Sequence, residues 1–386
     1  YAWGAQLERR SSPTQYSQTT TVPISKFQPA LQSAHVNSPR FDHDPVTGES
    51  KGLLIEEART NYAPYSTPDS NWIQAAYMIT PNYAIAPDGT QTAGFIHEST
   101  TSRQQLAYTH SGTTLTSGST YTFSVYAKAY THDTFQMHSY GDSSKTFYLS
   151  NPSNSSDSTM THVGNGWYRC TWTKTKSNTT STIYLGFDGA SYAGDANKGV
   201  LFWGAQVELG TFATSLIKTV GSTNTRALEE LADYNLESSS SSGRQSWFSS
   251  YKGTMFTDYT LFGSYVDAPY PRIHVTSIVG LRTSIEMMHY GGNVQHNFFL
   301  NNSLKLNQNR AVAINNKISG AMSWDFNQNL ASSAINGSAT NNTINGVPQR
   351  LARIYIGTSG WNGHIRKFAF YRDHFSNAEL VALTEE

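Results

Sequence analysis

The sequence predicts an all-β protein of tandem β-sandwiches with very little helix. Short stretches of alternating apolar and polar residues recur along its 386 residues, and segments rich in Gly, Asn, Ser or Pro separate them. Aromatic residues make up 13% of the chain, although its mean hydropathy is −0.47. Helical periodicity is confined to short stretches at 225–232 and 376–386, where Ser376 is a candidate N-cap. Because Thr and Tyr favour pleated sheets while Gly, Asn and Ser favour turns, this composition indicates many short strands.

The first complete module is predicted over residues 61–226. In its stretch 120–129, Tyr121, Phe123 and Val125 alternate with polar residues and therefore share one face of a strand. Closely spaced stretches of this kind are typical of a sandwich or jelly roll. The others lie at 134–141, 166–175, 181–189 and 200–209.

A second module is predicted over residues 246–386, after a linker at 227–245 that contains a run of serines. Residues 1–60 are expected to hold one strand followed by an extended connector punctuated by prolines. Strand-like stretches of the second module lie at 253–263, 272–280, 283–291, 310–316, 350–357 and 364–372.

The motif WGAQ occurs twice, at 3–6 and at 203–206, and the register continues through Glu8 and Glu208. A repeat at a fixed offset indicates repeated modules. Residues 1–20 are therefore interpreted as the closing strand of a preceding module. We expect them to belong to a longer polypeptide or to pack on a neighbouring subunit, because an unpaired strand with an exposed Trp favours aggregation.

Charge and cysteine content exclude several classes of protein. The 27 basic and 27 acidic residues give a formal net charge of zero, which argues against a nucleic-acid partner held by bulk electrostatics. No apolar run approaches the ~18 residues of a membrane span, so no membrane insertion is expected. Cys170 is the single cysteine, so no intrachain disulfide can form. Its side chain is expected to be buried as a small hydrophobe. Stability is expected from packed sheets and from assembly between subunits.

Four stretches of the chain resemble one family in matching order. The stretch RFDHDPVTGESKGLLIEEARTN at 40–61 resembles a segment that recurs in tail fibres and other structural proteins of tailed bacteriophages. Residues 165–169 and 202–217 resemble the end of the jelly-roll module that follows it there. Residues 225–227 resemble the lead into a LamG-like, concanavalin-type sandwich, whose closing strands resemble 357–384.

The resemblance implies a protein at the virion surface of a tailed bacteriophage, such as a tail fibre or appendage. Proteins of this kind are often homotrimers. Their modules contact other virion proteins and face host-surface polysaccharide. Residues 285–310, in the middle of the second module, depart from the family pattern, which leaves a loop-based site there unassigned.

Aromatic residues in loop-like settings are the candidate carbohydrate-binding residues. A sugar ring presents apolar C–H faces that stack on Trp or Tyr, while neighbouring polar side chains bond its hydroxyls. Aromatic residues at alternating strand positions are instead expected in the core, as for Phe123, Trp167 and Trp203. The candidates in loop-like settings are Trp72, Tyr77, Tyr83, Tyr192, Trp324 and Trp361.

No catalytic residues are assigned, and the chain is not expected to be an enzyme. Most glycosidases use a pair of carboxylates, whereas the adjacent acidic residues at 56–57 and 229–230 lie in predicted connectors. Asp188 and Asp195 flank a Gly-rich loop and are the candidate ligands of a structural calcium ion, the alternative being a solvated loop. The acidic stretch 42–49 has the oxygen-rich composition of a calcium loop or, alternatively, ordinary turn chemistry.

The sequence therefore favours a non-enzymatic phage virion protein that binds host cell-surface glycan through β-sandwich modules. Two alternatives stay open. A virion-associated polysaccharide depolymerase would release reducing ends or unsaturated sugars from its ligand. A purely architectural capsid decoration protein would bind no glycan.

Overall fold

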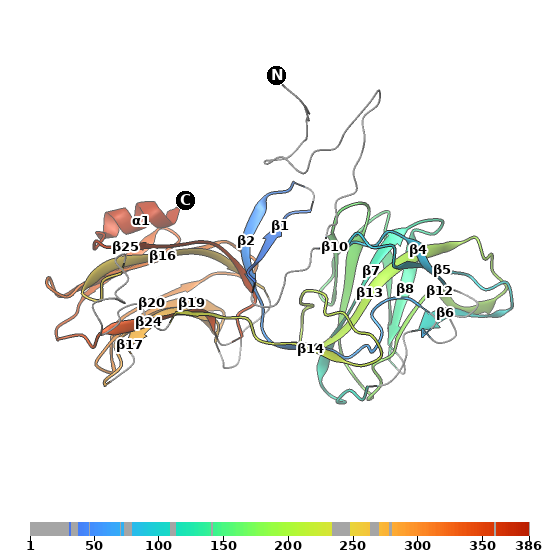
Figure 1. Cartoon of the computed structure of the whole chain (residues 1–386), viewed down its shortest axis with the longest axis horizontal. Helices are drawn as coiled ribbons and strands as arrows, with labels where there is room; N and C mark the ends of the chain where they lie inside the picture. The colour runs from blue at the N-terminus through green and yellow to red at the C-terminus, as the bar shows by residue number, and fades with distance from the viewer. Residues whose placement is uncertain are drawn as a thin grey trace, which may run out of the picture. The chain divides into compact units, whose positions relative to one another are not determined.

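The chain forms two units that are built almost entirely of strands (Figure 1). The first unit contains Arg59–Arg226, and the second contains Ala227–Glu386 together with Asn37–His43 and Ser50–Ala58. The expected all-β fold of tandem sandwiches with little helix is confirmed. The computed structural model describes residues 31, 38–45, 47–69, 71–72, 79–108, 113–139, 142–233, 248–262, 270–277, 280–358 and 360–385.

The first unit is a sandwich of two antiparallel sheets. The six-stranded sheet has the order β10 (Ser158–His162), β11 (Tyr168–Thr175), β7 (Thr120–Ala129), β13 (Gly199–Leu209), β5 (Ala93–His97) and β4 (Ile79–Ala84). The four-stranded sheet has the order β6 (Arg103–Tyr108), β12 (Ile183–Tyr192), β8 (Thr134–Ser139) and β9 (Ser144–Tyr148). A separate pair joins β3 (Arg59–Asn61) to β14 (Asn224–Arg226).

The core of the first unit lies between these two sheets. Phe123 and Val125 of β7 are fully buried, as the alternation of the sequence predicts. Phe135 of β8 meets Phe202 of β13 edge to face, with ring centroids 4.9 Å apart. Cys170 is also buried there, as expected, and burial raises the pKa of its thiol.

A second, smaller apolar cluster covers part of the opposite face of the six-stranded sheet, which we call its outer face. Trp167 and Trp203, both expected to be core residues, are buried in this cluster together with Phe95 and Tyr126. The indole Nε1 of Trp203 donates a hydrogen bond to Thr92 Oγ1 at 2.9 Å. The outer face is therefore aromatic as well as polar.

The spacing between the WGAQ motif and its Glu, which occurs twice in the sequence, has a direct explanation at β13. The buried Gln206 amide donates to Glu208 and accepts from the backbone N–H of Ile217, both at 2.6 Å. Glu208 in turn accepts from the backbone N–H of Thr214 at 3.0 Å. These bonds fasten the segment after β13 onto the strand. The matching residues 1–20 lie outside the described part of the chain, so their pairing stays a prediction.

The second unit is also a sandwich of two antiparallel sheets. Its seven-stranded sheet has the order β1 (Arg40–His43), β2 (Ser50–Ile55), β25 (Gly363–Tyr371), β16 (Lys252–Leu261), β21 (Ile318–Asp325), β22 (Leu330–Ile335) and β23 (Ser338–Thr343). Its six-stranded sheet has the order β15 (Leu231–Asp233), β24 (Leu351–Thr358), β17 (Arg272–Ser277), β18 (Ser284–Tyr290), β19 (Asn293–Leu300) and β20 (Ser303–Ala311).

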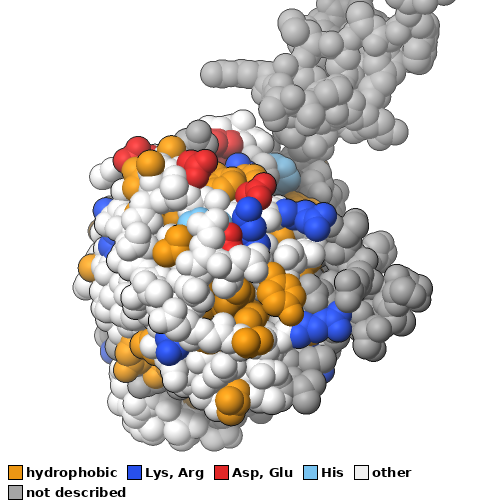
Figure 2. Space-filling model, turned by 90° about the vertical axis from the view of Figure 1, so that its left-hand side faces the viewer, with side chains coloured by type: hydrophobic (Ala, Val, Ile, Leu, Met, Phe, Trp, Pro, Cys, Tyr) orange, Lys and Arg blue, Asp and Glu red, His pale blue; other side chains and the backbone are white. Residues whose placement is uncertain are grey.

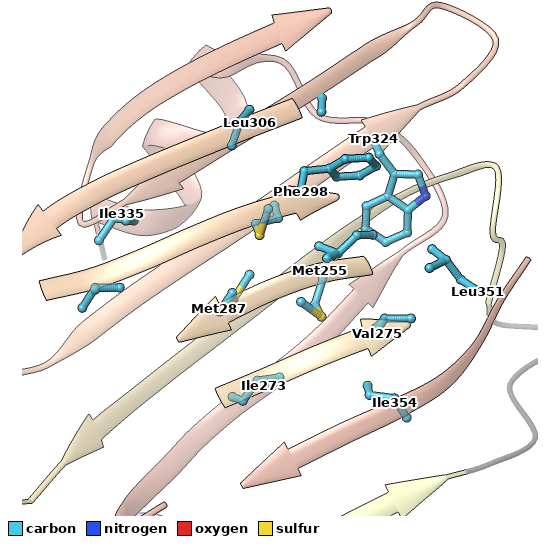
Figure 3. Close-up of a cluster of buried hydrophobic side chains, with 14 of the residues drawn as sticks. Met255, Ile273, Val275, Met287, Phe298, Leu306, Trp324, Ile335, Leu351 and Ile354 are labelled. Carbon is cyan, nitrogen blue, oxygen red and sulfur yellow. The ribbon is translucent and has the colours of Figure 1, made fainter. Parts of the chain in front are cut away.

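Apolar side chains from both sheets fill the space between them (Figure 3). Met255 and Trp324 come from the seven-stranded sheet, and Val275, Met287 and Phe298 come from the six-stranded sheet. All five side chains are at most 1% exposed. Burial of this kind contributes about 25 cal/mol for each Å² of apolar surface removed from water.

The structure corrects the expectation of an extended connector within residues 1–60. β1 and β2 form a hairpin that extends the seven-stranded sheet, where Leu53 pairs with Ile365 of β25. Asp42 accepts a hydrogen bond from His364 Nε2 at 2.8 Å. Gly52 has φ +96°, and a Cβ there would lie 2.3 Å from the Ile365 carbonyl oxygen, so the close approach of β2 to β25 requires glycine. The connector prediction failed because this pairing is made with a strand some 300 residues away in sequence.

Two further expectations concern helices and the linker. The short helix expected at 225–232 is wrong, because Asn224–Arg226 pairs with β3 and Leu231–Asp233 pairs with β24. β15 also lies within the expected linker 227–245, of which residues 234–245 fall outside the described part of the chain. Sheet hydrogen bonds outweigh the weak helix propensity of this stretch.

The C-terminal helix is confirmed. α1 (Asn377–Glu385) begins after Ser376, whose hydroxyl and backbone N–H both donate to Glu379 in a capping box. No helix among the described residues is both long and apolar enough to cross a membrane. Figure 2 shows hydrophobic side chains scattered over this face of the second unit, with acidic and basic side chains between them.

Candidate binding site

The candidate site lies on the outer face of the six-stranded sheet of the first unit. Side chains alternate along β5, so Ile96 points into the core while Phe95 and His97 point outward. β4 precedes β5 at the edge of the sheet and carries Tyr83. Tyr130 directly follows β7, on the other side of β13. Three strands thus bring aromatic side chains to one area.

Tyr83, Phe95 and Tyr130 form one aromatic cluster, called here the tyrosine cluster. The Tyr83 ring stacks on Phe95 at 4.9 Å between centroids with an interplanar angle of 30°. Tyr130 meets both rings edge to face, at 5.6 Å from Tyr83 and 5.3 Å from Phe95. Phe95 is only 5% exposed, whereas Tyr83 is 41% and Tyr130 53% exposed. A buried ring thus supports two rings that reach solvent.

The two tyrosine hydroxyls make the exposed side of the cluster polar. They lie 3.0 Å apart and form a hydrogen bond. This hydrogen bond to Tyr130 raises the pKa of Tyr83 above its usual value of 10.0, so the Tyr83 phenol is protonated at neutral pH. Paired ring surfaces with adjacent hydroxyls suit a ligand that has apolar faces and hydroxyl groups at its edges.

Glu98 follows His97 at the end of β5 and fastens the neighbouring loop. Its carboxylate accepts hydrogen bonds from Tyr192 Oη at 2.7 Å, His132 Nε2 at 3.0 Å and the backbone N–H of Asp195 at 2.9 Å. Burial opposes ionisation of this carboxyl, but the bonds from Asp195, Tyr192 and His132 lower its pKa below the usual range. Glu98 is therefore an ionised anchor for the loop that follows β12.

Two of the six candidate aromatic residues lie around β5. Tyr83 is exposed in the tyrosine cluster, and Tyr192 is half-buried with its hydroxyl on Glu98. The exposed Tyr83 ring is available for stacking on a ligand. The Tyr192 hydroxyl instead donates to Glu98 and helps to hold the loop that follows β12. Tyr77 lies outside the described residues.

The prediction that Trp72, Trp324 and Trp361 bind carbohydrate is wrong. Each of these side chains is at most 1% exposed and offers no ring face to a ligand. Trp72 donates from Nε1 to the Tyr65 carbonyl oxygen at 3.2 Å. Trp324 is a strand residue of β21 and donates to the Ser250 carbonyl oxygen at 3.2 Å. Trp361 packs against the buried Tyr259 ring at 5.2 Å between centroids. All three are core side chains.

The expected calcium site is only partly described. The exposed Asp195 carboxylate accepts hydrogen bonds from the backbone N–H and the side-chain amide of Asn197, at 2.9 and 3.0 Å, and these bonds lower its pKa. The side chain of Asp188 lies outside what the structure describes. Among the described residues, no group of three His, Cys, Asp or Glu side chains is placed to hold a metal ion. Calcium binding stays a prediction.

Sequence reasoning missed Tyr130, Phe95, Glu98 and His132. A signal for Tyr130 was present, because continuing the alternation of β7 through Tyr126 and Lys128 places it on the outer face. Phe95 could not be recognised as a support, since its partners Tyr83 and Tyr130 lie far apart in the sequence.

Comparison with known proteins gives no family assignment. No protein-family model and no curated protein matches the sequence. Solved structures that resemble it include the CBM40 of Ruminococcus gnavus IT-sialidase, at 14% identity over 36% of this chain and 84% of that chain, with a TM-score of 0.29. Domains LG4-5 of the mouse laminin alpha1 chain match at 8% identity over 81% and 95%, with a TM-score of 0.27. The SAP-like pentraxin of Limulus polyphemus matches at 11% identity over 34% and 69%, with a TM-score of 0.26. No conclusion about this chain rests on these distant likenesses.

Proposed function

We propose that the chain binds glycans through the tyrosine cluster, without catalysing a reaction on them. The observation that carries this proposal is the pair of exposed rings of Tyr83 and Tyr130 on a buried Phe95. A ring that is already packed in the unbound protein loses little conformational freedom when a ligand stacks on it. The hydroxyls of the two tyrosines then donate to and accept from sugar hydroxyls.

A non-catalytic role is supported by the state of the acidic group at this site. Glycosidases that cleave with two carboxyl groups place them about 5–9.5 Å apart around the bond that breaks, and one of them has a raised pKa. Glu98 instead has a lowered pKa and is held by three hydrogen bonds within the protein. This carboxylate is suited to fixing the loop rather than to donating a proton.

The resemblance of residues 40–61 and 202–217 to phage structural proteins supports a finer version of the proposal. In this version the chain is a tail-fibre or appendage subunit at the virion surface, assembled as a homotrimer with other virion proteins. Its glycan ligand is the host surface polysaccharide, and its role is host attachment. Antibody labelling of virions in electron microscopy and light scattering of the purified chain test these points. Absence of the protein from virions overturns the proposed location at the virion surface. A stable monomer at micromolar concentration overturns the proposed homotrimer.

Glycan binding itself is tested with the full chain on an array of bacterial surface polysaccharides. The comparison is between the wild type, the Tyr83→Ala variant and a Tyr148→Ala control. Tyr148 is 52% exposed on the other sheet of the same unit and lies outside the tyrosine cluster. The proposal expects a signal that Tyr83→Ala removes and Tyr148→Ala preserves. No signal for the wild type, or equal loss in both variants, contradicts it.

A further inference from the structure

Asn-Gly dipeptides occur in the chain at 165–166, 336–337, 345–346 and 362–363. In this dipeptide the backbone nitrogen of the glycine can attack the side-chain amide carbon of the asparagine, because glycine has no Cβ to obstruct the approach. The attack needs an amide that can turn toward its own backbone and a glycine N–H that is not held elsewhere. The surroundings of each dipeptide therefore decide whether it reacts.

The dipeptide in the turn between β22 and β23 is held at both reacting groups. The Asn336 side chain accepts from the Ser319 N–H at 2.7 Å and donates to the Lys317 carbonyl oxygen at 3.4 Å. The Gly337 N–H, which would be the nucleophile, donates to Thr384 Oγ1 at 3.0 Å. These hydrogen bonds must break before the two groups can meet.

The dipeptide at the start of β25 is buried. Asn362 is 0% exposed, and its side-chain oxygen accepts from the backbone N–H of Glu57 at 3.0 Å. Gly363 belongs to the strand and pairs with Leu261 of β16. Reaction here would require the strand to leave the sheet.

The dipeptide between β10 and β11 is exposed but forms a closed turn. Asn165 and Gly166 have φ of 51° and 77°, and the Trp167 N–H donates to the Gly164 carbonyl oxygen at 2.9 Å across them. Rotation of the Asn165 backbone into the geometry of attack would break this turn.

Asn345 and Gly346, in the connection from β23 to β24, differ from the other three pairs. Both residues are exposed, and neither belongs to a strand. In the part of the chain that the structure describes, neither the Asn345 side chain nor the Gly346 N–H has a hydrogen-bond partner. Both groups that must meet are therefore unrestrained at this dipeptide.

We propose that Asn345 is a site of spontaneous deamidation in the folded chain. The Gly346 nitrogen attacks Asn345 Cγ and closes a succinimide ring, while the side-chain nitrogen leaves as ammonia and carries away the Gly346 N–H proton. Solvent water then opens the ring. Attack of water on Cγ gives aspartate, and attack on the backbone carbonyl carbon gives isoaspartate. The site is independent of the function proposed for the tyrosine cluster.

Both products change the connection from β23 to β24. Each replaces a neutral amide by a carboxylate and adds one negative charge to a chain whose formal net charge is zero. Isoaspartate also lengthens the main chain by one atom shortly before Val347, whose carbonyl oxygen accepts from Asn301 Nδ2 at 3.1 Å. We expect this hydrogen bond to be lost in the isoaspartate form.

The test is a time course of the full chain at mildly alkaline pH, in buffer and in concentrated guanidinium chloride. Peptide mass spectrometry measures aspartate and isoaspartate at the four positions. In buffer, conversion at Asn345 should be about fivefold or more faster than at Asn165, Asn336 or Asn362, because a hydrogen bond of about 1 kcal/mol must break at each of those. In guanidinium chloride the four rates should become similar. No faster conversion at Asn345 in buffer overturns the proposal, and an equal preference in guanidinium chloride overturns its structural cause.

Asn345→Gln is the control variant. It keeps an exposed amide at this position, but the ring that it would close is larger and forms much more slowly. This variant should lose the product at position 345 and keep the slow conversion at Asn336 unchanged. Product formation at position 345 at the wild-type rate would contradict the succinimide route.

Discussion

The hydroxyls of Tyr83 and Tyr130 lie 3.0 Å apart on the first unit, although 47 residues separate them in sequence. The strand order explains how they meet. β4 lies beside β5, β5 beside β13, and β13 beside β7, so residues from distant stretches share one sheet face. Phe95 packs under both rings and fixes their positions. The candidate glycan site is thus a product of topology rather than of a local motif.

The first prediction concerns Tyr130. Replacing Tyr130 by Phe keeps the ring and removes the hydroxyl that bonds Tyr83, whereas Tyr130→Ala removes both. If stacking dominates glycan binding, Tyr130→Phe should weaken affinity less than tenfold and Tyr130→Ala more than about tenfold. Titration calorimetry with a glycan that binds the wild type measures the difference. Affinity that falls equally in both variants would show that the hydroxyl, and not the ring, carries the contact.

The second prediction concerns Glu98 and the loop after β12. Glu98→Gln keeps the size of the side chain but removes the charge that Tyr192, His132 and the Asp195 N–H contact. We expect a loss of about 1–3 kcal/mol in the free energy of unfolding and faster hydrogen exchange in residues 193–198. Denaturant unfolding and exchange mass spectrometry measure the two effects. The exposed Glu49→Gln change is the control, and an equal effect there would mean that Glu98 is no anchor.

The pH dependence of this anchor follows from its lowered pKa. The pKa of Glu98 is lower in the folded chain than the 4.5 of the unfolded one. Its contribution to stability is therefore present above the unfolded value and is lost as the pH falls through the folded value. The Glu98→Gln variant should lose less stability than the wild type on acidification through this range.

The third prediction concerns the buried ion pair of Lys176 and Asp142. The Lys176 side chain is fully buried, Asp142 is 2% exposed, and their charged atoms lie 2.5 Å apart. Lys176→Met leaves the buried carboxylate without its cation and should cost about 3–5 kcal/mol. The double variant Lys176→Met with Asp142→Leu should recover much of that loss. A double variant no more stable than Lys176→Met would argue against unpaired charge as the cause.

The same pair predicts loss of stability in strong acid. Burial opposes ionisation of Asp142, but hydrogen bonds from Lys176 and Ser177 lower its pKa from 3.8 to about 2. The unfolded chain therefore binds a proton at a higher pH than the folded chain, and stability is lost as the pH falls from about 4 to about 2. Across this pH range the free energy of unfolding should change less with pH for Asp142→Asn than for the wild type. Denaturant unfolding at a series of pH values measures the difference.

The fourth prediction concerns His296 of β19, which is buried between the sheets of the second unit. Its Nδ1 lies 2.7 Å from Ser333 Oγ, and burial lowers the pKa of the imidazole to about 3. Because the unfolded histidine binds a proton near pH 6.5, stability should fall as the pH drops from 6.5 toward 3. Urea unfolding at pH 7 and pH 5 measures this fall. His296→Gln should reduce it, and the exposed His43→Gln control should not.

The fifth prediction concerns the closing strand of the first unit. Gln206→Leu removes the amide that bonds Glu208 and the Ile217 N–H; the buried Ile217 N–H loses this acceptor, and Glu208 keeps only its hydrogen bonds from Thr214. A loss of about 1–3 kcal/mol is expected. Gln91→Leu, on an exposed residue, is the matched control. Equal stability of the two variants would show that the Gln of the repeated WGAQ motif does not fasten the strand.

Strand pattern and core were predictable because they depend on alternation within a few residues. Phe123 and Val125 are buried as their spacing requires, and Ser376 caps α1 as its position before Glu379 requires. The hairpin β1–β2 was not predictable, because its partner β25 lies at the opposite end of the sequence. The same limit applied to the short pairing of β15 with β24.

The candidate site was only partly predictable for a related reason. Trp324 stands among Ser, Asp and Asn, so it looked like a loop residue, yet it belongs to a strand that is paired on both sides. Tyr83 was expected in a loop but lies on strand β4, where its ring is exposed. Its value as a binding group depends on Phe95 and Tyr130, and only the fold brings these residues to it.

The central claim is that exposed tyrosines bind a glycan without cleaving it. The most direct measurement is calorimetric titration of a bacterial surface polysaccharide that binds on the array into wild type and Tyr83→Ala, followed by analysis of the recovered polysaccharide. The account predicts saturable binding by the wild type, at least tenfold weaker binding by Tyr83→Ala, and polysaccharide of unchanged length. Equal affinity of the two proteins, or release of reducing ends or unsaturated sugars, would contradict it.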